Sequence, residues 1–380
     1  MDIAFRLDPE LIIGADTINR IGAFCNKYGG RALVATEQVL YENQNIERLT
    51  TILSDSNIES IVFDEIPAQA TADVAETAAS LARGARCSAI VGFGGLKTQS
   101  IARLAAILAG SRHEIFDLLD GRKPDDAFLP YIAVPTTGRD PFLFSGYFIA
   151  VDPRDRSVKL VKSPERLCAA AIIDSGLSES LSGTFSATTA FDGFCVAVEA
   201  YCSSRASFLS DALLEQAISL YAQMMKVYMD NQSFDLVKSA TSAGFLMALG
   251  SAVSAPGIGA ALSYALNGRF PVAKSWCSTV LLPYVMERLV TARPEKIAKV
   301  AALMGEPVEG ASVADSAAMA VDTIRNYMGV LKVPARLKDF NLELDRLIPV
   351  ADAARSLEFV AFSPWTVAAE DAFDILKQAY

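Results

Sequence analysis

The first 150 residues alternate short runs of β-branched and apolar residues with amphipathic segments. Residues 44–56 and 72–85 repeat their apolar positions at helical spacing, so we expect each of them to form a helix. The apolar runs around these segments are bounded by turn-forming residues and predict four strands, at residues 31–37, 58–66, 87–95 and 131–137. Strands that alternate with helices build βαβ units, and the pattern therefore predicts a mostly parallel sheet.

The pattern changes after about residue 183. From there almost to Tyr380, stretches rich in Ala, Leu and Met keep helical spacing, and β-branched runs become rare. We therefore expect an α/β domain in residues 1–183 and an all-helical domain in residues 184–380.

One segment of the second domain could be mistaken for a membrane span. Residues 239–268 include no charged side chain and are numerous enough to cross a bilayer. They are also rich in Ala, Ser and Gly, and the pair Pro256-Gly257 interrupts them. This composition favours two short helices packed inside a protein, so we do not expect a membrane as a partner.

Composition narrows the class of protein. With 380 residues, of which 52% are hydrophobic and 21% charged, the chain is long and apolar enough for two domains with cores of their own. The net charge of −10 arises without a long run of either sign, which indicates a solvated acidic surface and argues against nucleic acid as a partner. Six scattered cysteines and a start without a basic region followed by an apolar stretch favour a cytoplasmic location.

The segment "IVGFGGLKTQSIARLAA", residues 90–106, predicts a strand, a glycine-rich turn and a helix. Glycines at positions 92, 94 and 95 would let backbone N–H groups approach a pyrophosphate, and the start of the helix would favour an anion. The alternative is purely steric, because tight turns between a strand and a helix also use glycine. The segment is not a Walker loop, since no Gly-Lys-Ser/Thr follows at the required spacing.

Further motifs follow in a specific order: "VPTTGRD", "AAAIIDSGLSESLS", "FDGFCVAVEAY" and "VLLPYVME". Together with the glycine-rich turn, this order resembles the iron-containing (group III) alcohol dehydrogenase family and its relatives, glycerol dehydrogenase and dehydroquinate synthase, over essentially the whole chain. The resemblance implies a Rossmann-like N-terminal domain that binds a nicotinamide dinucleotide and a dehydroquinate synthase-like helical C-terminal domain. It also implies an NAD(H)-dependent oxidoreductase that interconverts a small alcohol and its aldehyde.

The resemblance also implies which residues bind the dinucleotide. Glu37 ends a predicted strand where the family commonly has Asp, and a carboxylate there accepts hydrogen bonds from ribose hydroxyls and repels a 2′-phosphate. We therefore expect NAD(H) to be preferred over NADP(H), unless Glu37 is only a capping or surface residue. The other expected cofactor-binding residues are Gly92, Gly94, Gly95, Lys97, Thr98, Pro135, Thr136 and Thr137.

The metal site of the family is incomplete in this sequence. The resemblance makes Asp192 a metal ligand, which we expect on the first turn of an apolar helix, but Val196 stands where the family has a histidine one turn later. Two further histidine positions match Ala260 and Lys274, and a nearby one matches Tyr264. The single histidine of the chain lies in the α/β half. We therefore expect no divalent metal.

Two hypotheses follow. In the first, the protein is an oxidoreductase without the family metal, and a cation, Lys274 or Arg139, stabilises charge on the substrate oxygen while Asp192 serves as an ion-pair partner. A simpler role for Lys274 is that it only neutralises Asp192. In the second hypothesis, the protein is a non-catalytic dinucleotide-binding or regulatory homologue.

The start of the chain bears on assembly. The residues "MDIAFRL" alternate apolar and polar positions as an edge strand does. Members of the family that the chain resembles commonly pair through this edge of the sheet. We therefore expect a homodimer.

Overall fold

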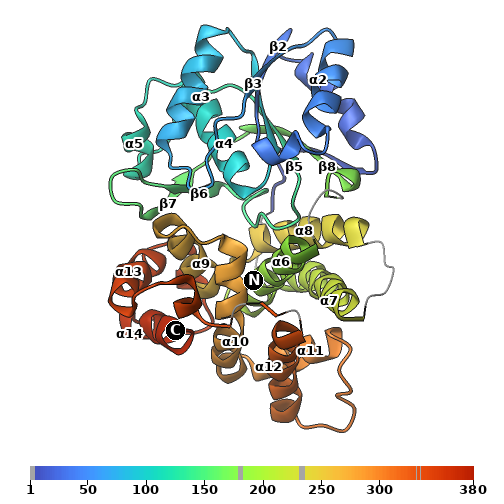
Figure 1. The fold of residues 1–380 in the computed structure, drawn as a ribbon, viewed down its shortest axis with the longest axis vertical. Coiled ribbons are helices and arrows are strands. Elements are labelled where there is room, and N and C mark those ends of the chain that lie inside the picture. Colours follow the sequence, from blue (N-terminus) through green and yellow to red (C-terminus); the bar gives the residue numbers. More distant parts are fainter. Residues whose placement is uncertain (1–4, 179–182, 231–235, 331, 334) are drawn as a thin grey trace. The chain divides into compact units, whose positions relative to one another are not determined.

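The chain folds into two compact units, Met1–Ser180 and Leu181–Tyr380, in a computed structural model (Figure 1). The boundary precedes the one expected from the sequence, after residue 183, by a few residues. The structure describes residues 5–178, 183–230, 236–330, 332–333 and 335–380.

The first unit is built on a six-stranded sheet in the order β1-β8-β5-β4-β2-β3, in which every neighbouring pair is parallel. This confirms the parallel α/β fold expected from the alternating pattern. Two more strands, β6 and β7, form a separate antiparallel hairpin. The strands are β1 (Glu10–Gly14), β2 (Arg31–Ala35), β3 (Glu59–Phe63), β4 (Ala89–Gly94), β5 (Tyr131–Pro135), β6 (Tyr147–Val151), β7 (Val158–Lys162) and β8 (Cys168–Asp174).

Helices cover both faces of this sheet, and Figure 1 shows α2 and α3 on opposite sides of it. Because side chains alternate along a strand, Val91 and Phe93 of β4 face the core under α1 and α2, where Leu49 is fully buried. On the other face, Gly92 lies against α4, where an added Cβ would be 3.0 Å from the Cβ of Ala102. The helices are α1 (Ile21–Cys25), α2 (Asn45–Asp55), α3 (Asp73–Gly84), α4 (Leu96–Gly110) and α5 (Ile115–Leu119).

The four strands expected from the sequence are β2, β3, β4 and β5, and the two expected helices are α2 and α3. All six are confirmed, with ends that move by a few residues. The expected edge strand in residues 1–7 is wrong where the structure describes it, because residues 5–8 are outside any strand. Residues 1–4 lie outside the described residues. The strand at that edge of the sheet is β1, which starts at Glu10.

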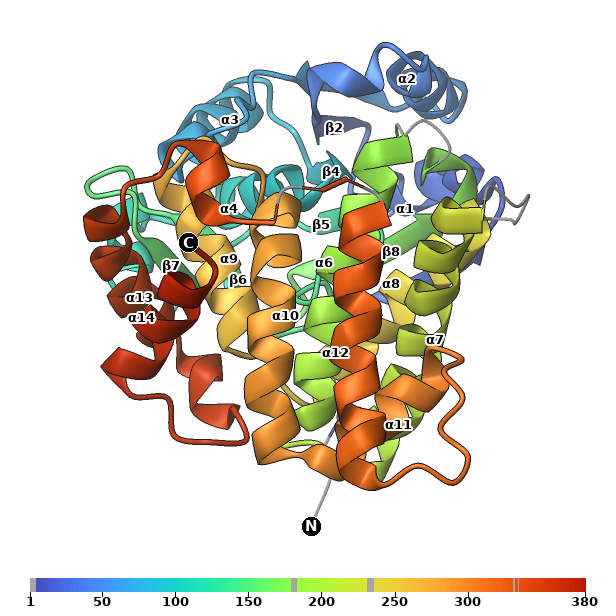
Figure 2. The same cartoon turned by 60° about the horizontal axis from the view of Figure 1, so that its bottom comes forward.

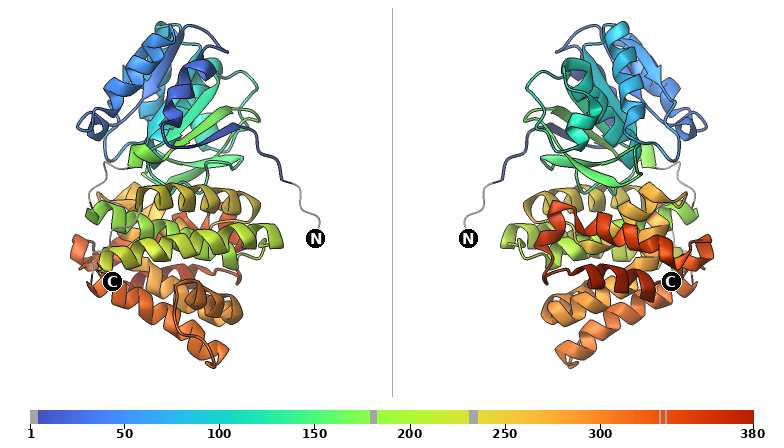
Figure 3. Two further views of the ribbon diagram at one scale, coloured as in Figure 1. Left: turned by 90° about the vertical axis from the view of Figure 1, so that its right-hand side faces the viewer. Right: turned by 90° about the vertical axis from the view of Figure 1, so that its left-hand side faces the viewer.

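The second unit is helical throughout its described residues, as expected. Its helices stack in layers (Figure 3), and α10 runs alongside α12 (Figure 2). The α-helices are α6 (Gly183–Cys202), α7 (Phe208–Asp230), α8 (Leu236–Val253), α9 (Ile258–Arg269), α10 (Lys274–Ala292), α11 (Pro294–Leu303), α12 (Val313–Val330), α13 (Ile348–Arg355) and α14 (Ala369–Gln378).

The uncharged segment at residues 239–268 forms α8 and α9, which confirms the two short helices expected on either side of Pro256-Gly257. In the described part of the chain, no single helix has both the length and the apolarity to cross a membrane. Residues 239–253 and 258–269 meet that criterion only as a pair, across a bend of 109°.

Candidate functional site

The glycine-rich turn joins β4 to α4 in the first unit. Gly94 has a φ of +157°, and a Cβ on it would lie 2.8 Å from both the Glu37 Oε1 and the Thr98 Oγ1 atoms. The turn therefore requires glycine at position 94. Gly95 is the N-cap residue of α4, a helix of 15 residues, so the N–H groups at the start of this helix lie at the turn. A helix end of this kind binds anions, because its N–H groups lack partners within the helix and its dipole is positive there.

Glu37 lies on this turn. Its Oε1 atom accepts a hydrogen bond of 2.7 Å from the Gly95 N–H and another of 2.7 Å from the Thr98 hydroxyl. The carboxylate follows β2 directly, and β2 pairs with β4, so the parallel sheet brings the ends of both strands to one edge. Glu37 is also the N-cap residue of a short 3-10 helix, Gln38–Leu40, but its side chain makes no capping bond to that helix and contacts the glycine-rich turn instead.

The end of β5 reaches the same edge of the sheet. Pro135 is paired with Gly94, and the Thr136 N–H donates to the Gly94 carbonyl at 3.1 Å. The Thr137 Oγ1 atom lies 3.8 Å from the place where a Cβ on Gly95 would be. The structure therefore brings together the expected cofactor-binding residues from β4, α4 and β5, with Glu37 beside them.

Gly92 has a different role from the other two glycines. It lies inside β4, where a Cβ would come within 3.0 Å of Ala102 and 2.9 Å of the Tyr131 ring, so close packing explains the glycine without a ligand. Gln99 is a residue that the sequence did not single out. Its Nε2 atom donates to the Gly92 and Gly94 carbonyls, each at 2.9 Å, and so fixes the strand that leads into the turn.

Lys97 and Arg139 place positive charge next to the turn. Burial, with smaller effects of the charges of Arg139 and Arg156, lowers the pKa of Lys97 to about 8, although the charge of Glu37 opposes this shift. Arg139 belongs to the loop after β5, where its N–H donates to the Thr137 carbonyl at 3.1 Å. The glycine-rich turn therefore carries a negative carboxylate, Glu37, and a positive side chain, Lys97, whose pKa also responds to the charge of Arg139.

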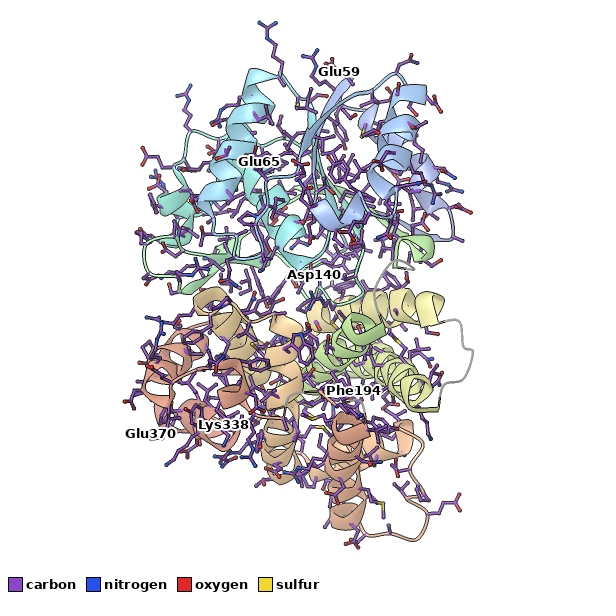
Figure 4. The ribbon with its side chains drawn as sticks, viewed as in Figure 1. Glu59, Glu65, Asp140, Phe194, Lys338 and Glu370 are labelled. Atoms are coloured by element: carbon purple, nitrogen blue, oxygen red, sulfur yellow. The ribbon has the colours of Figure 1, made fainter. Side chains whose placement is uncertain are left out.

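The loop that carries Arg139 is held by a buried ion pair. Asp140, labelled in Figure 4, lies 3.1 Å from the Arg103 guanidinium, and both side chains are less than 10% exposed. The same carboxylate accepts the Phe142 N–H at 2.9 Å, and Arg103 donates to the Phe142 carbonyl at 3.2 Å. The segment that follows β5 is thus fixed to α4 through Arg103.

Asp192 belongs to the second unit and lies near the middle of α6, ten residues from Cys202. The expectation that it begins the helix was wrong. The Ser- and Thr-rich residues before Phe191 have weak helix propensity, but Thr188 is fully buried there, and tertiary packing overrides propensity. Figure 4 labels Phe194 on the same helix, another fully buried side chain.

The carboxylate of Asp192 is fully buried and forms an ion pair with the Lys274 ammonium. The Ser278 hydroxyl, one turn further along α10, donates to the same carboxylate oxygen at 2.6 Å. Lys274 is itself only 3% exposed, and its Nζ atom lies 4.5 Å from the centre of the Tyr264 ring on α9. The three helices that carry the expected ligand positions, α6, α9 and α10, therefore meet at this ammonium group.

A second contact joins α6 to α9. The buried carboxylate of Glu199 accepts the Gly259 N–H at 2.6 Å and the Ala260 N–H at 2.9 Å, and so satisfies the start of α9. Burial raises the pKa of Glu199 to about 7, although the N–H groups of Ala260 and Gly259 oppose the rise. The sequence did not point to Ser278 as a partner of Asp192, although Ser278 follows Lys274 at helical spacing.

The donor set around Asp192 does not fit a divalent cation. Val196 and Ala260 are fully buried, and their side chains offer no ligand atom. The carboxylate of Asp192 is already paired with the ammonium of Lys274. An ammonium group repels a dication and becomes a ligand only after it loses its proton. Among the residues that the structure describes, no three His, Cys, Asp or Glu side chains converge as metal ligands would.

Comparisons with known proteins agree with both units. The family model for iron-containing alcohol dehydrogenase matches residues 8–175, and the model for the C-terminal part of the Fe-containing alcohol dehydrogenase family matches residues 186–380. The long-chain-alcohol dehydrogenase 1 of Geobacillus thermodenitrificans is 26% identical, over 100% of this chain and 98% of that protein. The NAD-dependent methanol dehydrogenase of Bacillus methanolicus is 20% identical, over 99% of both chains.

Solved structures share the fold over its full length. A crystal structure of 1,3-propanediol oxidoreductase matches with a TM-score of 0.92 at 23% identity, and covers 100% of both chains. The sulfoacetaldehyde reductase of Bifidobacterium kashiwanohense, solved with NAD⁺, matches with a TM-score of 0.85 at 16% identity, over 100% of this chain and 99% of that one. Since the two family models together span nearly the whole sequence, the chain belongs to the iron-containing alcohol dehydrogenase family, whose members are alcohol and aldehyde dehydrogenases.

Proposed function

We propose that the protein interconverts a small alcohol and its aldehyde with NAD(H) and without a divalent metal. The observation that carries the proposal is the buried ion pair between Lys274 and Asp192, which joins two of the expected ligand positions and supplies a cation there in place of a metal ion. Relatives support the choice of reaction and of cofactor, since one is an NAD-dependent methanol dehydrogenase and another is a lactaldehyde reductase.

In this proposal, the dinucleotide binds at the glycine-rich turn. The N–H groups at the start of α4 suit the pyrophosphate, and the ammonium of Lys97 adds a positive charge beside them. The carboxylate of Glu37 suits the ribose hydroxyls and opposes a 2′-phosphate, which favours NAD(H). When bound, the nicotinamide ring supplies the hydride or accepts it. The full proposed set is Glu37, Gly94, Gly95, Lys97, Thr98, Pro135, Thr136 and Thr137, and Gly92 supports it by letting α4 pack closely against the strand that leads into the turn.

Lys274 is the residue that we propose to act on the substrate oxygen. As an aldehyde is reduced, negative charge grows on its oxygen, and a fixed cation in a dry site stabilises that charge more strongly than water does. Asp192 and Ser278 fix the position of the ammonium group. Arg139, on the loop beside the glycine-rich turn, is the second cation proposed to stabilise charge on the substrate.

The same ion pair also fits a second function, in which Lys274 has only a structural role. Asp192 already neutralises the charge of Lys274 in a buried site, which is what a purely structural role for the lysine requires. In that case, the protein is a dinucleotide-binding or regulatory homologue without turnover. Proposals common to both functions are a cytoplasmic location and no role for nucleic acid or membrane as a partner.

One experiment distinguishes the two functions. NADH fluorescence is titrated with the purified protein, and the complex is then mixed with a panel of short aldehydes while absorbance at the nicotinamide band is followed. A fluorescence change followed by aldehyde-dependent oxidation supports the enzyme. A fluorescence change without oxidation of NADH by any aldehyde supports the binding protein, and the absence of any change contradicts both.

A further inference from the structure

The carboxylate of Glu37 accepts the hydrogen bonds that a bound phosphate would need. The N–H of Gly95 and the hydroxyl of Thr98 both point to one atom, Glu37 Oε1, at 2.7 Å. These are the groups at the start of α4 that would otherwise face a phosphate oxygen. The chain therefore holds an anion of its own in the place where the anion of a ligand would bind.

The space at the turn does not admit both anions at the same donors. A methyl group added to Gly94 would already lie 2.8 Å from Glu37 Oε1, and one added to Gly95 would lie 3.3 Å from it. A phosphate oxygen within hydrogen-bonding distance of the Gly95 N–H would meet the carboxylate oxygen at similar range. Two negative oxygens at that separation repel each other strongly, so the carboxylate has to move when a phosphate binds.

We propose that Glu37 makes the turn selective for phosphates that are attached to a ribose. The phosphate takes over the Gly95 N–H and the Thr98 hydroxyl, and the displaced carboxylate accepts hydrogen bonds from the two ribose hydroxyls. A nucleotide thus replaces the bonds that Glu37 loses, whereas a free phosphate or pyrophosphate ion does not. This inference rests on the proposed binding of a dinucleotide and adds to it the reason why unattached phosphate ions are rejected.

The surrounding charges agree with this role. Lys97 is the cation next to Glu37, and the carboxylate opposes the lowering of the Lys97 pKa by burial and by Arg139. While Glu37 lies on the turn, its negative charge offsets part of this positive charge. When the carboxylate moves to the ribose, the full charge of the lysine acts on the phosphate.

The test compares two probes, ADP and inorganic pyrophosphate, by isothermal titration calorimetry at fixed pH and ionic strength. Glu37 competes with pyrophosphate for the two donors, so Glu37→Ala should bind pyrophosphate about ten-fold more tightly than the natural protein. ADP regains at the ribose the bonds that it displaces, so its affinity should change little, and the preference for ADP over pyrophosphate should fall about ten-fold. Glu37→Gln keeps an acceptor without the charge and should raise pyrophosphate affinity by a smaller factor. Glu42→Ala is the control, because it removes an exposed carboxylate from the same region and changes the net charge equally.

The outcomes separate this inference from the proposed reaction. Unchanged or weaker pyrophosphate binding in Glu37→Ala overturns the inference, and so does an equal gain in Glu42→Ala, which would show a general effect of charge. A gain specific to position 37 supports it even if the protein turns out not to oxidise NADH, because binding alone is measured. Unchanged thermal unfolding of the three variants shows that the fold is intact, as expected for side chains that are not fully buried.

Discussion

Replacing Lys274 with methionine should destabilise the helical unit strongly. The substitution removes an ammonium whose side chain is 3% exposed and leaves the fully buried carboxylate of Asp192 without its countercharge. Breaking a buried ion pair from one side costs about 3–5 kcal/mol, because the remaining charge stays out of water. The variant also loses the contact of the ammonium with the Tyr264 ring, which is worth up to about 2 kcal/mol when desolvated. We therefore expect a loss near the upper end of that range.

The double variant Lys274→Met with Asp192→Asn separates the charge from the packing. It removes both charges and keeps an acceptor for the Ser278 hydroxyl, so most of the stability should return, to within about 2 kcal/mol of the natural protein. Urea unfolding followed by tryptophan fluorescence measures the effect, since Trp276 and Trp365 are the two tryptophans of the chain and both belong to the helical unit. A single variant as stable as the natural protein, or a double variant less stable than the single one, would refute this account of the pair.

Three further predictions concern titration and assembly. Burial raises the pKa of Glu199 from 4.5 to about 7, so the native state binds a proton more tightly than the unfolded state between these values. The urea concentration at the midpoint of unfolding should therefore decrease as the pH is raised from about 5 to about 8. Glu199→Gln should reduce this pH dependence, and an equal dependence in the variant would count against the prediction. The lowered pKa of Lys97, about 8, predicts that ADP affinity falls as the pH rises through that value and that Lys97→Met loses this dependence; an unchanged profile in the variant would exclude Lys97 as the cause. Light scattering at micromolar concentration should give twice 40.7 kDa, the mass of a homodimer, and a monomer would contradict that expectation.

The sequence predicted four neighbouring strands of the sheet, β5, β4, β2 and the edge strand β3, and missed β8 and β1 at the other side. Strands β2, β4 and β5 are continuous apolar runs because both faces of a central parallel strand are buried. The edge strand β1 was not predicted, because it carries exposed or half-buried positions and its partner, β8, is distant in sequence. The hairpin of β6 and β7 was not predicted either, although its two strands are neighbours in sequence. β8 has the apolar composition of a strand and lies between β1 and β5, but it was not predicted as one.

The candidate sites were predictable where the chemistry follows from adjacent residues. Gly94, Gly95 and Thr98 are close in sequence, and a turn between a strand and a helix has to bring them together. The partners that hold them were not predictable, because the contact of Glu37 with Gly95 spans 58 residues. Similarly, the sequence suggested that Lys274 could neutralise Asp192, but the hydrogen bonds of Glu199 to the start of α9 depend on how the helices pack.

The central claim is that the Lys274–Asp192 pair takes the place of the metal. The donor set around Asp192 lacks the imidazoles that bind iron or zinc, and an ammonium group occupies the one carboxylate. The most direct measurement is elemental analysis of dialysed protein, combined with aldehyde-dependent oxidation of NADH by the same sample before and after treatment with EDTA. We predict well below one equivalent of iron or zinc and a rate that EDTA does not change, whereas a stoichiometric metal whose removal abolishes turnover would contradict the account.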